Sequence, residues 1–271
     1  MELKNRTAMP LWCGAPPAGE SDPAQIPEII PYAPPVWKFN HRALVIFPGG
    51  GYHVLANYEG PGFAEFFADQ GYYCFVVNYR LGDNLGKTGC HHPAQISDAA
   101  RTVRLVRSWA KELGYKADRI GVIGSSAGGH LAATVSVLPE LGLTIPEEGE
   151  VAKVSSRPDF AVLCYPVISL EEPHTHEGSK MNLLGEGHDP ALCEKLSLEK
   201  QVNEHTPPTF LYHRVGDKAV PLENSLFYAQ ALRKYGVPFE LHIYEKGGHG
   251  GALAQGHPWA AEALRWIDTL D

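Results

Sequence analysis

Short apolar runs alternate with helical patterns along most of this chain, and this alternation restricts its fold more than any other feature. The runs are rich in β-branched and aromatic residues, as buried strands are. They are RALVIF (42–47), YYCFVVNYR (72–80), RIGVIG (119–124), FAVLCYPVI (160–168), TFLYHRV (209–215) and FELHIYE (239–245). Strands that alternate with helices predict an α/β fold, with a mostly parallel sheet covered by helices on both faces.

Helices are predicted between these runs. The longest starts at Pro93, keeps its apolar residues at a period of 3.6 and ends at Gly114. The others are expected at 61–70, from the turn after Gly124 through Val135, near Ala191, at 222–234 and at 257–270.

The length of 271 residues, without an internal repeat or a linker, favours one domain over 1–271. Residues 10–41 are rich in proline and lack periodicity, so residues 1–41 are predicted to form an extended N-terminal arm on the domain surface. Residues 139–206 carry few regular signals, and we expect an irregular region of surface loops near the mouth of a site.

The charge pattern bears on possible partners. The formal net charge is −8, and the chain lacks the cluster of basic residues typical of nucleic-acid binding. Arg101, Arg104 and Arg107 recur at three-residue spacing on the long predicted helix, where a solvated helix face is expected. No run approaches the ~20 apolar residues of a membrane span. We therefore expect no nucleic-acid partner and no membrane partner.

The five cysteines are scattered without a CxxC pair, which favours reduced thiols over a disulfide framework. The N-terminal residues MELKNRTAMPLWCG contain no apolar stretch of signal-peptide length. Together these features predict a cytoplasmic protein.

Residues 124–128, GSSAG, match the pattern G-x-S-x-G with Ser126 at its centre. In this motif a sharp strand-to-helix turn exposes a nucleophilic serine. The five-residue match alone is weak, but a strand is predicted before it and a helix after it, as the motif requires. Ser126 is therefore the candidate nucleophile, and the alternative is a glycine-rich corner with incidental hydroxyl groups.

A serine hydroxyl needs a histidine base and a carboxylate that orients the base. His249, in YEKGGHGG, and Asp217, in HRVGDKAVP, each follow a predicted strand, at the edge where α/β sheets build their sites. Their order after Ser126 is that of the α/β hydrolases. Glu223 is the alternative acid. Three other histidines, His213, His242 and His257, also lie in the last third of the chain. His242 lies within a predicted strand and His257 opens a predicted helix, so neither is well placed to meet Ser126.

The loop FPGGGYH after the first strand offers backbone N–H groups for an oxyanion hole. By analogy with HGGG-type loops, Gly50 and Gly51 are expected to act with Ala127, the residue after the serine. The alternative is a phosphate-binding loop, but neither phosphate-loop pattern fits.

Metal binding is the other chemistry that we considered. The candidate ligands are Cys90, His91, His92, His174, His176 and His188. Adjacent residues rarely direct both side chains at one ion, and no second pair completes a tetrahedral set. No metal site and no cofactor are predicted.

Several longer segments resemble one enzyme family. They include VIFPGGGYHVLANYEGPGFAEFF, HHPAQISDAARTVRLVRS, DRIGVIGSSAGGHLAAT and TPPTFLYHRVGDKAVPLENSLFYAQALRKYGVPFELHIYEKGGHG. Together they are similar to the small α/β-hydrolase acetyl esterases, often called acetylxylan esterase-like or bifunctional acetylxylan/feruloyl esterases. The resemblance runs from about Pro10 onward.

The resemblance implies an α/β-hydrolase fold with Ser126 as nucleophile, Asp217 as acid, His249 as base and the PGGG loop as oxyanion hole. Arg214, in HRVGD, departs from the family pattern, where a small residue or threonine is more usual. Proline stands where HGGG lipases have histidine, so long-chain lipase activity is not implied.

The expected function is a cofactor-free serine esterase that removes acetyl groups from acetylated sugars, such as imported xylo-oligosaccharides, through an acetyl-enzyme. Four aromatic or histidine residues follow the oxyanion loop or strand ends: Tyr52, His53, Tyr79 and Tyr165. Each is expected either to pack in the core or to contact the substrate. The alternatives are a feruloyl or general short-chain carboxylesterase, a formamidase, and a catalytically silent binding protein that keeps the fold.

Overall fold

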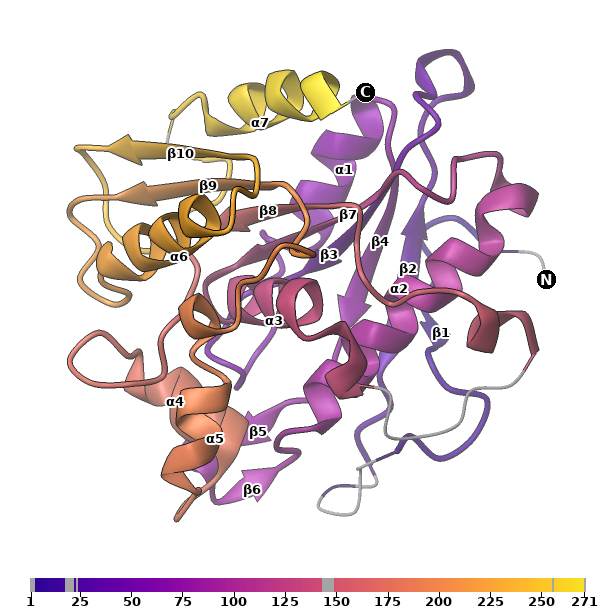
Figure 1. Cartoon of the computed structure of the whole chain (residues 1–271). Coiled ribbons are helices and arrows are strands. Elements are labelled where there is room, and N and C mark those ends of the chain that lie inside the picture. The colour runs from indigo at the N-terminus through magenta and orange to yellow at the C-terminus, as the bar shows by residue number, and fades with distance from the viewer. Residues whose placement is uncertain (1–2, 18–21, 23, 143–148, 255, 271) are drawn as a thin grey trace.

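An eight-stranded sheet forms the centre of the structure, a computed structural model that describes all residues except 1–2, 18–21, 23, 143–148, 255 and 271 (Figure 1). The strand order is β1-β2-β4-β3-β7-β8-β9-β10. The pairs from β4 to β10 are parallel, whereas β1 and β2 run antiparallel at one edge. The predicted α/β class, with a mostly parallel sheet, is confirmed.

The bounds of the elements follow the predicted segments closely. The strands of the main sheet are β1 (Met9–Pro10), β2 (Glu28–Tyr32), β3 (Ala43–Phe47), β4 (Tyr73–Asn78), β7 (Ile120–Ser125), β8 (Phe160–Cys164), β9 (Thr209–Arg214) and β10 (Phe239–Tyr244). The α-helices are α1 (Pro61–Asp69), α2 (Ala94–Leu113), α3 (Ser126–Val137), α4 (Glu177–Leu184), α5 (Pro190–Lys195), α6 (Glu223–Lys234) and α7 (Trp259–Ile267). A separate hairpin is formed by β5 (Gly82–Asp83) and β6 (Thr88–Gly89), joined by the 3₁₀ turn Asn84–Gly86.

The sheet separates two apolar clusters because successive strand residues face opposite sides. In β3, Val45 belongs to the cluster that includes residues of α2, α3 and α6, whereas Leu44 and Ile46 belong to the cluster that includes residues of α1 and α7. All five residues of β3 are fully buried. This burial on both faces explains why the central strands appear in the sequence as continuous apolar runs.

The described part of the N-terminal segment 1–41 is not only the surface arm that the sequence predicted. Residues 1–2, 18–21 and 23 lie outside this described segment. It supplies β1 and β2, and β2 pairs with β4 along Glu28–Tyr32. The sequence predicted a solvated face on the long helix, and this prediction is wrong at Arg101. The Arg101 side chain is buried under the N-terminal segment. Its Nε donates to the carbonyl oxygen of Leu11 at 2.6 Å, and its guanidinium lies 4.5 Å from the centre of the Trp12 ring.

The region 139–206 is more regular than expected, although residues 143–148 lie outside the described part. It contains β8, α5 and also α4, which the sequence did not predict. Helix α4 packs against the turn between β5 and β6, where a Cβ on Gly86 would meet the carbonyl oxygen of Met181 at 2.3 Å. Figure 1 shows α4, α5 and the hairpin together at one end of the molecule.

Among the helices of the described chain, none has both the length and the apolar character needed to cross a membrane.

Candidate active site

Ser126 lies at the abrupt junction between β7 and α3. Its backbone has φ of +54°, in the left-handed region that residues with a side chain rarely adopt. The two glycines of the motif permit this turn, because a Cβ on Gly124 would lie 2.0 Å from the carbonyl oxygen of Gly128, and one on Gly128 would lie 2.1 Å from that of Phe47. The strained turn separates the two serines: Ser125 is fully buried, whereas the hydroxyl of Ser126 reaches a histidine.

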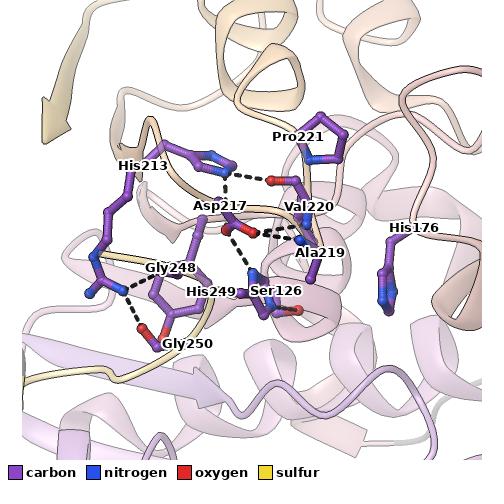
Figure 2. A network of polar contacts seen from close by, with 12 residues as sticks. Ser126, His176, His213, Asp217, Ala219, Val220, Pro221, Gly248, His249 and Gly250 are labelled. Carbon is purple, nitrogen blue, oxygen red and sulfur yellow. Dashed lines mark hydrogen bonds and ion pairs between the residues drawn. The ribbon is translucent and has the colours of Figure 1, made fainter. Parts of the chain in front are cut away.

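The structure brings Ser126, His249 and Asp217 into one hydrogen-bonded chain (Figure 2). His249 Nε2 lies 2.8 Å from Ser126 Oγ, and His249 Nδ1 lies 2.7 Å from Asp217 Oδ2. Because the carboxylate accepts the Nδ1–H group, the other ring nitrogen is left to accept the serine proton. This arrangement can activate a serine nucleophile.

Asp217 is held as an anion by several donors. Its Oδ1 accepts the N–H groups of Ala219 and Val220, both at 3.0 Å, and His213 Nε2 lies 3.4 Å from Oδ2 (Figure 2). Burial would raise the pKa of Asp217, but hydrogen bonds from His213, His249 and Val220 outweigh it and hold the pKa well below its usual range. An ionised carboxylate is the form that orients and stabilises a protonated His249.

The glycine loop after β3 directs two N–H groups away from its own turn. The carbonyl oxygens of Gly49 and Gly50 accept from Ala56 and from His53 and Val54, at 2.9–3.0 Å. In a planar trans peptide the N–H group points opposite to the C=O, so the N–H groups of Gly50 and Gly51 face the other way. Ala127 adds a further N–H group from the first turn of α3, where helix donors lack partners in the helix. These three residues can form the predicted oxyanion hole.

A buried carboxylate, Glu59, fastens this loop from behind. Its Oε2 accepts the Gly49 N–H at 2.8 Å, and its Oε1 accepts the hydroxyl of Tyr165 at 2.6 Å. Burial raises the pKa of Glu59 above its usual value. The hydrogen bonds from Tyr165 and Gly49 lower it but offset only part of this rise. The Tyr165 ring also meets the His249 ring edge-on, with 5.1 Å between their centres. Glu59 and Tyr165 thus connect the glycine loop with the loop that carries His249 between β10 and α7 (245–258), called the histidine loop.

Arg214, the departure from the family pattern, fastens the histidine loop from the other side. It is fully buried at the end of β9, and its Nη1 donates to the carbonyl oxygen of Gly248 at 2.8 Å and to that of Gly250. These two residues flank His249, so Arg214 helps to hold the base in position. Arg214 is not among the residues that line the pocket beside the glycine loop.

The predicted substrate contacts are corrected in part. Tyr52 and Tyr165 are buried, and the Tyr52 hydroxyl bonds to His130 Nδ1 at 2.9 Å, so both are core residues. Their strand-end positions suggested a cleft, but their rings turn inward and their hydroxyls find buried partners. Tyr79 likewise donates to the carbonyl oxygen of Pro48 at 2.6 Å. His53 is half-exposed, lies 3.1 Å from Asp83 and lines a pocket beside the glycine loop.

Two of the residues considered as metal ligands have other partners. His91 Nδ1 and His188 Nδ1 lie 3.1 and 2.9 Å from the carbonyl oxygens of Asn182 and Gly185. Within the described ranges, no three His, Cys, Asp or Glu side chains gather in a way that could hold a metal ion.

Comparison with known proteins shows which family this chain belongs to. The profile described as BD-FAE matches residues 31–232, about three quarters of the chain. The chain belongs to the BD-FAE family. This result agrees with the sequence resemblance and with the α/β-hydrolase fold.

Relatives of the BD-FAE chain include an acetylxylan esterase from Xylanibacter ruminicola, 37% identical over 216 residues, and endo-1,4-beta-xylanase B from Butyrivibrio fibrisolvens, 33% identical over 211 residues. These matches cover 77% and 78% of this chain but only 41% and 32% of the two relatives, respectively. The crystal structure of an acetyl ester-xyloside bifunctional hydrolase from Caldicellulosiruptor lactoaceticus matches with a TM-score of 0.88 and 41% identity, over 99% of this chain and 97% of that one.

Sequence reasoning missed Glu59, His213 and His176 as members or neighbours of this BD-FAE site. His213 could have been found, because it precedes Asp217 by four residues at the end of a predicted strand. Glu59 gave no comparable signal, since a glutamate before a predicted helix is ordinarily exposed.

Proposed function

We propose that this chain is a serine esterase that removes acetyl groups from acetylated sugars such as xylo-oligosaccharides. The observation that carries the proposal is the hydrogen-bonded chain from Ser126 through His249 to Asp217, with 2.8 and 2.7 Å between its members. The named relatives supply the substrate class, since two of them are an acetylxylan esterase and an acetyl ester-xyloside hydrolase.

In the proposed mechanism, His249 Nε2 takes the proton of Ser126 as Oγ attacks the acetyl carbonyl carbon. The N–H groups of Gly50, Gly51 and Ala127 stabilise the oxyanion that forms. His249 then protonates the departing sugar oxygen and leaves an acetyl-enzyme. A water molecule, deprotonated by the same histidine, attacks the acetyl-enzyme, and acetate leaves as the Ser126 hydroxyl is restored.

The test measures acetate release from acetylated xylo-oligosaccharides, beside hydrolysis of 4-nitrophenyl acetate, by the wild type and by Ser126→Ala. We expect both activities in the wild type and a loss of at least about 10⁴-fold in the variant, as in other serine hydrolases. Fluorophosphonate should label the wild type and not the variant.

Each other outcome overturns part of the proposal. Hydrolysis of 4-nitrophenyl acetate alone would keep the mechanism and reject the sugar substrate, in favour of a general carboxylesterase, and methyl ferulate and N-formyl amides would then be tried. Activity that survives in Ser126→Ala would reject the nucleophile. Neither activity nor label in the wild type would indicate a silent scaffold.

A further inference from the structure

A pocket of ≈ 460 Å³ opens directly beside the glycine loop. Its walls come from three segments: the glycine loop, the turn between β5 and β6, and helix α4 with its cap residue. The lining residues are Gly50, Gly51, His53, Leu85, His176, Gly178 and Asn182. Ligand pockets commonly measure about 300–1,000 Å³. An acetyl group occupies little of such a volume, so the pocket is suited to a larger part of the ester.

One hydrogen bond fixes α4 to the glycine loop. Asn182 is buried, and its Nδ2 donates to the carbonyl oxygen of Gly51 at 2.9 Å. The pocket wall is therefore held in register with the oxyanion hole, and a group bound there has a fixed position relative to Ser126.

His176 presents a defined donor to this pocket. It caps α4, and its Nδ1 accepts the N–H of Ser179 at 3.2 Å. A neutral imidazole whose Nδ1 accepts carries its proton on Nε2. Burial lowers the pKa of His176, which favours this neutral form. Among the residues that the structure describes, the Nε2–H group has no hydrogen-bond partner.

The ring of His176 lies near the catalytic residues. His249 and Asp217 are near enough to affect the pKa of His176, and Figure 2 shows its ring at the height of Ser126, with Ser126 between it and His249 in this view. Because His249 protonates the leaving oxygen in the proposed mechanism, the alcohol part of the ester lies within reach of this histidine, and His176 is near enough to contact the rest of the alcohol.

The opposite wall is apolar and strained. Leu85 has φ of +53° and a largely exposed side chain. A branched aliphatic residue rarely adopts this conformation, and such strain often marks a ligand site. Nearby, His53 Nδ1 lies 3.1 Å from Asp83 Oδ1, and both side chains are about half-exposed. An apolar side chain facing polar groups suits a sugar ring, which has C–H faces and hydroxyl edges.

We propose that this pocket, the leaving-group pocket, binds the sugar ring from which the acetyl group is removed, with His176 Nε2–H donating to a sugar oxygen and Leu85 covering a C–H face. The inference rests on the proposed esterase function and adds the residues that select the alcohol.

The decisive variant is His176→Asn. Asparagine is a favoured helix cap, so α4 keeps its N-terminal hydrogen bond while the imidazole donor is lost. A single lost hydrogen bond predicts that the kcat/KM for acetylated xylo-oligosaccharides, divided by that for 4-nitrophenyl acetate, falls about three- to tenfold. Leu85→Asn, which suits a left-handed backbone, should lower the same ratio. His205→Ala, an exposed histidine far from the pocket, is the control and should leave the ratio at its wild-type value.

An unchanged ratio in both pocket variants would overturn the inference. So would an altered preference between 4-nitrophenyl acetate and butyrate with the sugar ratio intact, because the pocket would then hold the acyl chain. A wild type that cleaves 4-nitrophenyl acetate but no acetylated sugar would reject the proposed substrate as well, and that result is visible without any variant.

Discussion

The hydroxyl of Tyr165 lies 2.6 Å from Oε1 of the buried Glu59, and through this contact the chain links two loops of its active site. Glu59 holds the N–H of Gly49 in the glycine loop, while Tyr165 accepts the N–H of Ala252 at 3.3 Å in the histidine loop. The oxyanion donors and the base are thereby fixed relative to each other, as electrostatic stabilisation of a transition state requires.

Glu59→Gln should therefore lower kcat more than it changes KM. The amide keeps the shape but loses the charge and one acceptor oxygen, so the glycine loop can shift. Since removing an oxyanion donor outright costs about 10²–10³-fold, we expect a loss of about ten- to a hundredfold in kcat with KM within about twofold. Steady-state kinetics with 4-nitrophenyl acetate measure both constants.

Tyr165→Phe should show the same pattern more weakly, because Glu59 then keeps its bond to Gly49. Glu65→Gln, on the exposed face of α1, serves as the control. An unchanged kcat in Glu59→Gln would show that the pair serves only core packing.

Arg214→Lys tests the second support of His249. Both carbonyl oxygens accept from Nη1, and a lysine side chain is shorter and lacks the planar guanidinium that places this nitrogen between them. The histidine loop then loses a charge-assisted bond inside the protein, and we expect kcat to fall about tenfold and the free energy of unfolding to fall by about 1–3 kcal/mol. Urea unfolding and kinetics on the same samples give both values, with the exposed Arg233→Lys as the control. Wild-type kcat in the variant would contradict a positioning role.

The pKa of Asp217 predicts a pH dependence of stability. Because the folded-state pKa lies below the unfolded value of about 3.9, the unfolded chain binds the proton first as the pH falls. The stability from this carboxylate is thus fully present above about pH 5, where the unfolded chain is also ionised, and is lost as the pH falls toward the folded pKa. Asp217→Asn removes this contribution.

Urea titrations of both proteins between pH 3 and pH 7 measure the effect. The difference in free energy of unfolding between wild type and Asp217→Asn should be constant above about pH 5 and should shrink below pH 4. A difference that grows on acidification would reverse the sign and refute the assignment.

The kcat of the Asp217→Asn variant should fall about 10⁴-fold at neutral pH, as expected for a base without its orienting carboxylate.

The sequence predicted the parts of the site that depend on chain order and strand ends. Ser126, Asp217 and His249 each follow a parallel strand, so sheet topology alone places them at one edge. The direction of Tyr52 and Tyr165 could not be predicted, because an aromatic residue after a strand can turn outward or inward, and the choice depends on distant partners such as His130 and Glu59. The pairing of β2 with β4 was missed for a related reason, since Pro27 and Pro31 interrupt the pattern around this short strand, which lies next to the edge strand β1.

Asp98 shows the same dependence on distant partners and leads to a prediction for stability. In the core of α2 it binds Arg80 through contacts of 2.8 and 2.9 Å and accepts the indole N–H of Trp12 at 2.8 Å. The side chains of Arg80 and Asp98 are both fully buried, and removing one partner of such a pair typically costs about 3–5 kcal/mol. We expect that loss in the free energy of unfolding for Asp98→Asn, and about 1 kcal/mol for Trp12→Phe, which removes one hydrogen bond. Asp69→Asn, which breaks the exposed pair with Lys38, should cost less than about 1 kcal/mol. Urea unfolding of the three variants gives this order, and equal losses in Asp98→Asn and Asp69→Asn would show that the buried pair contributes no more to stability than the exposed pair.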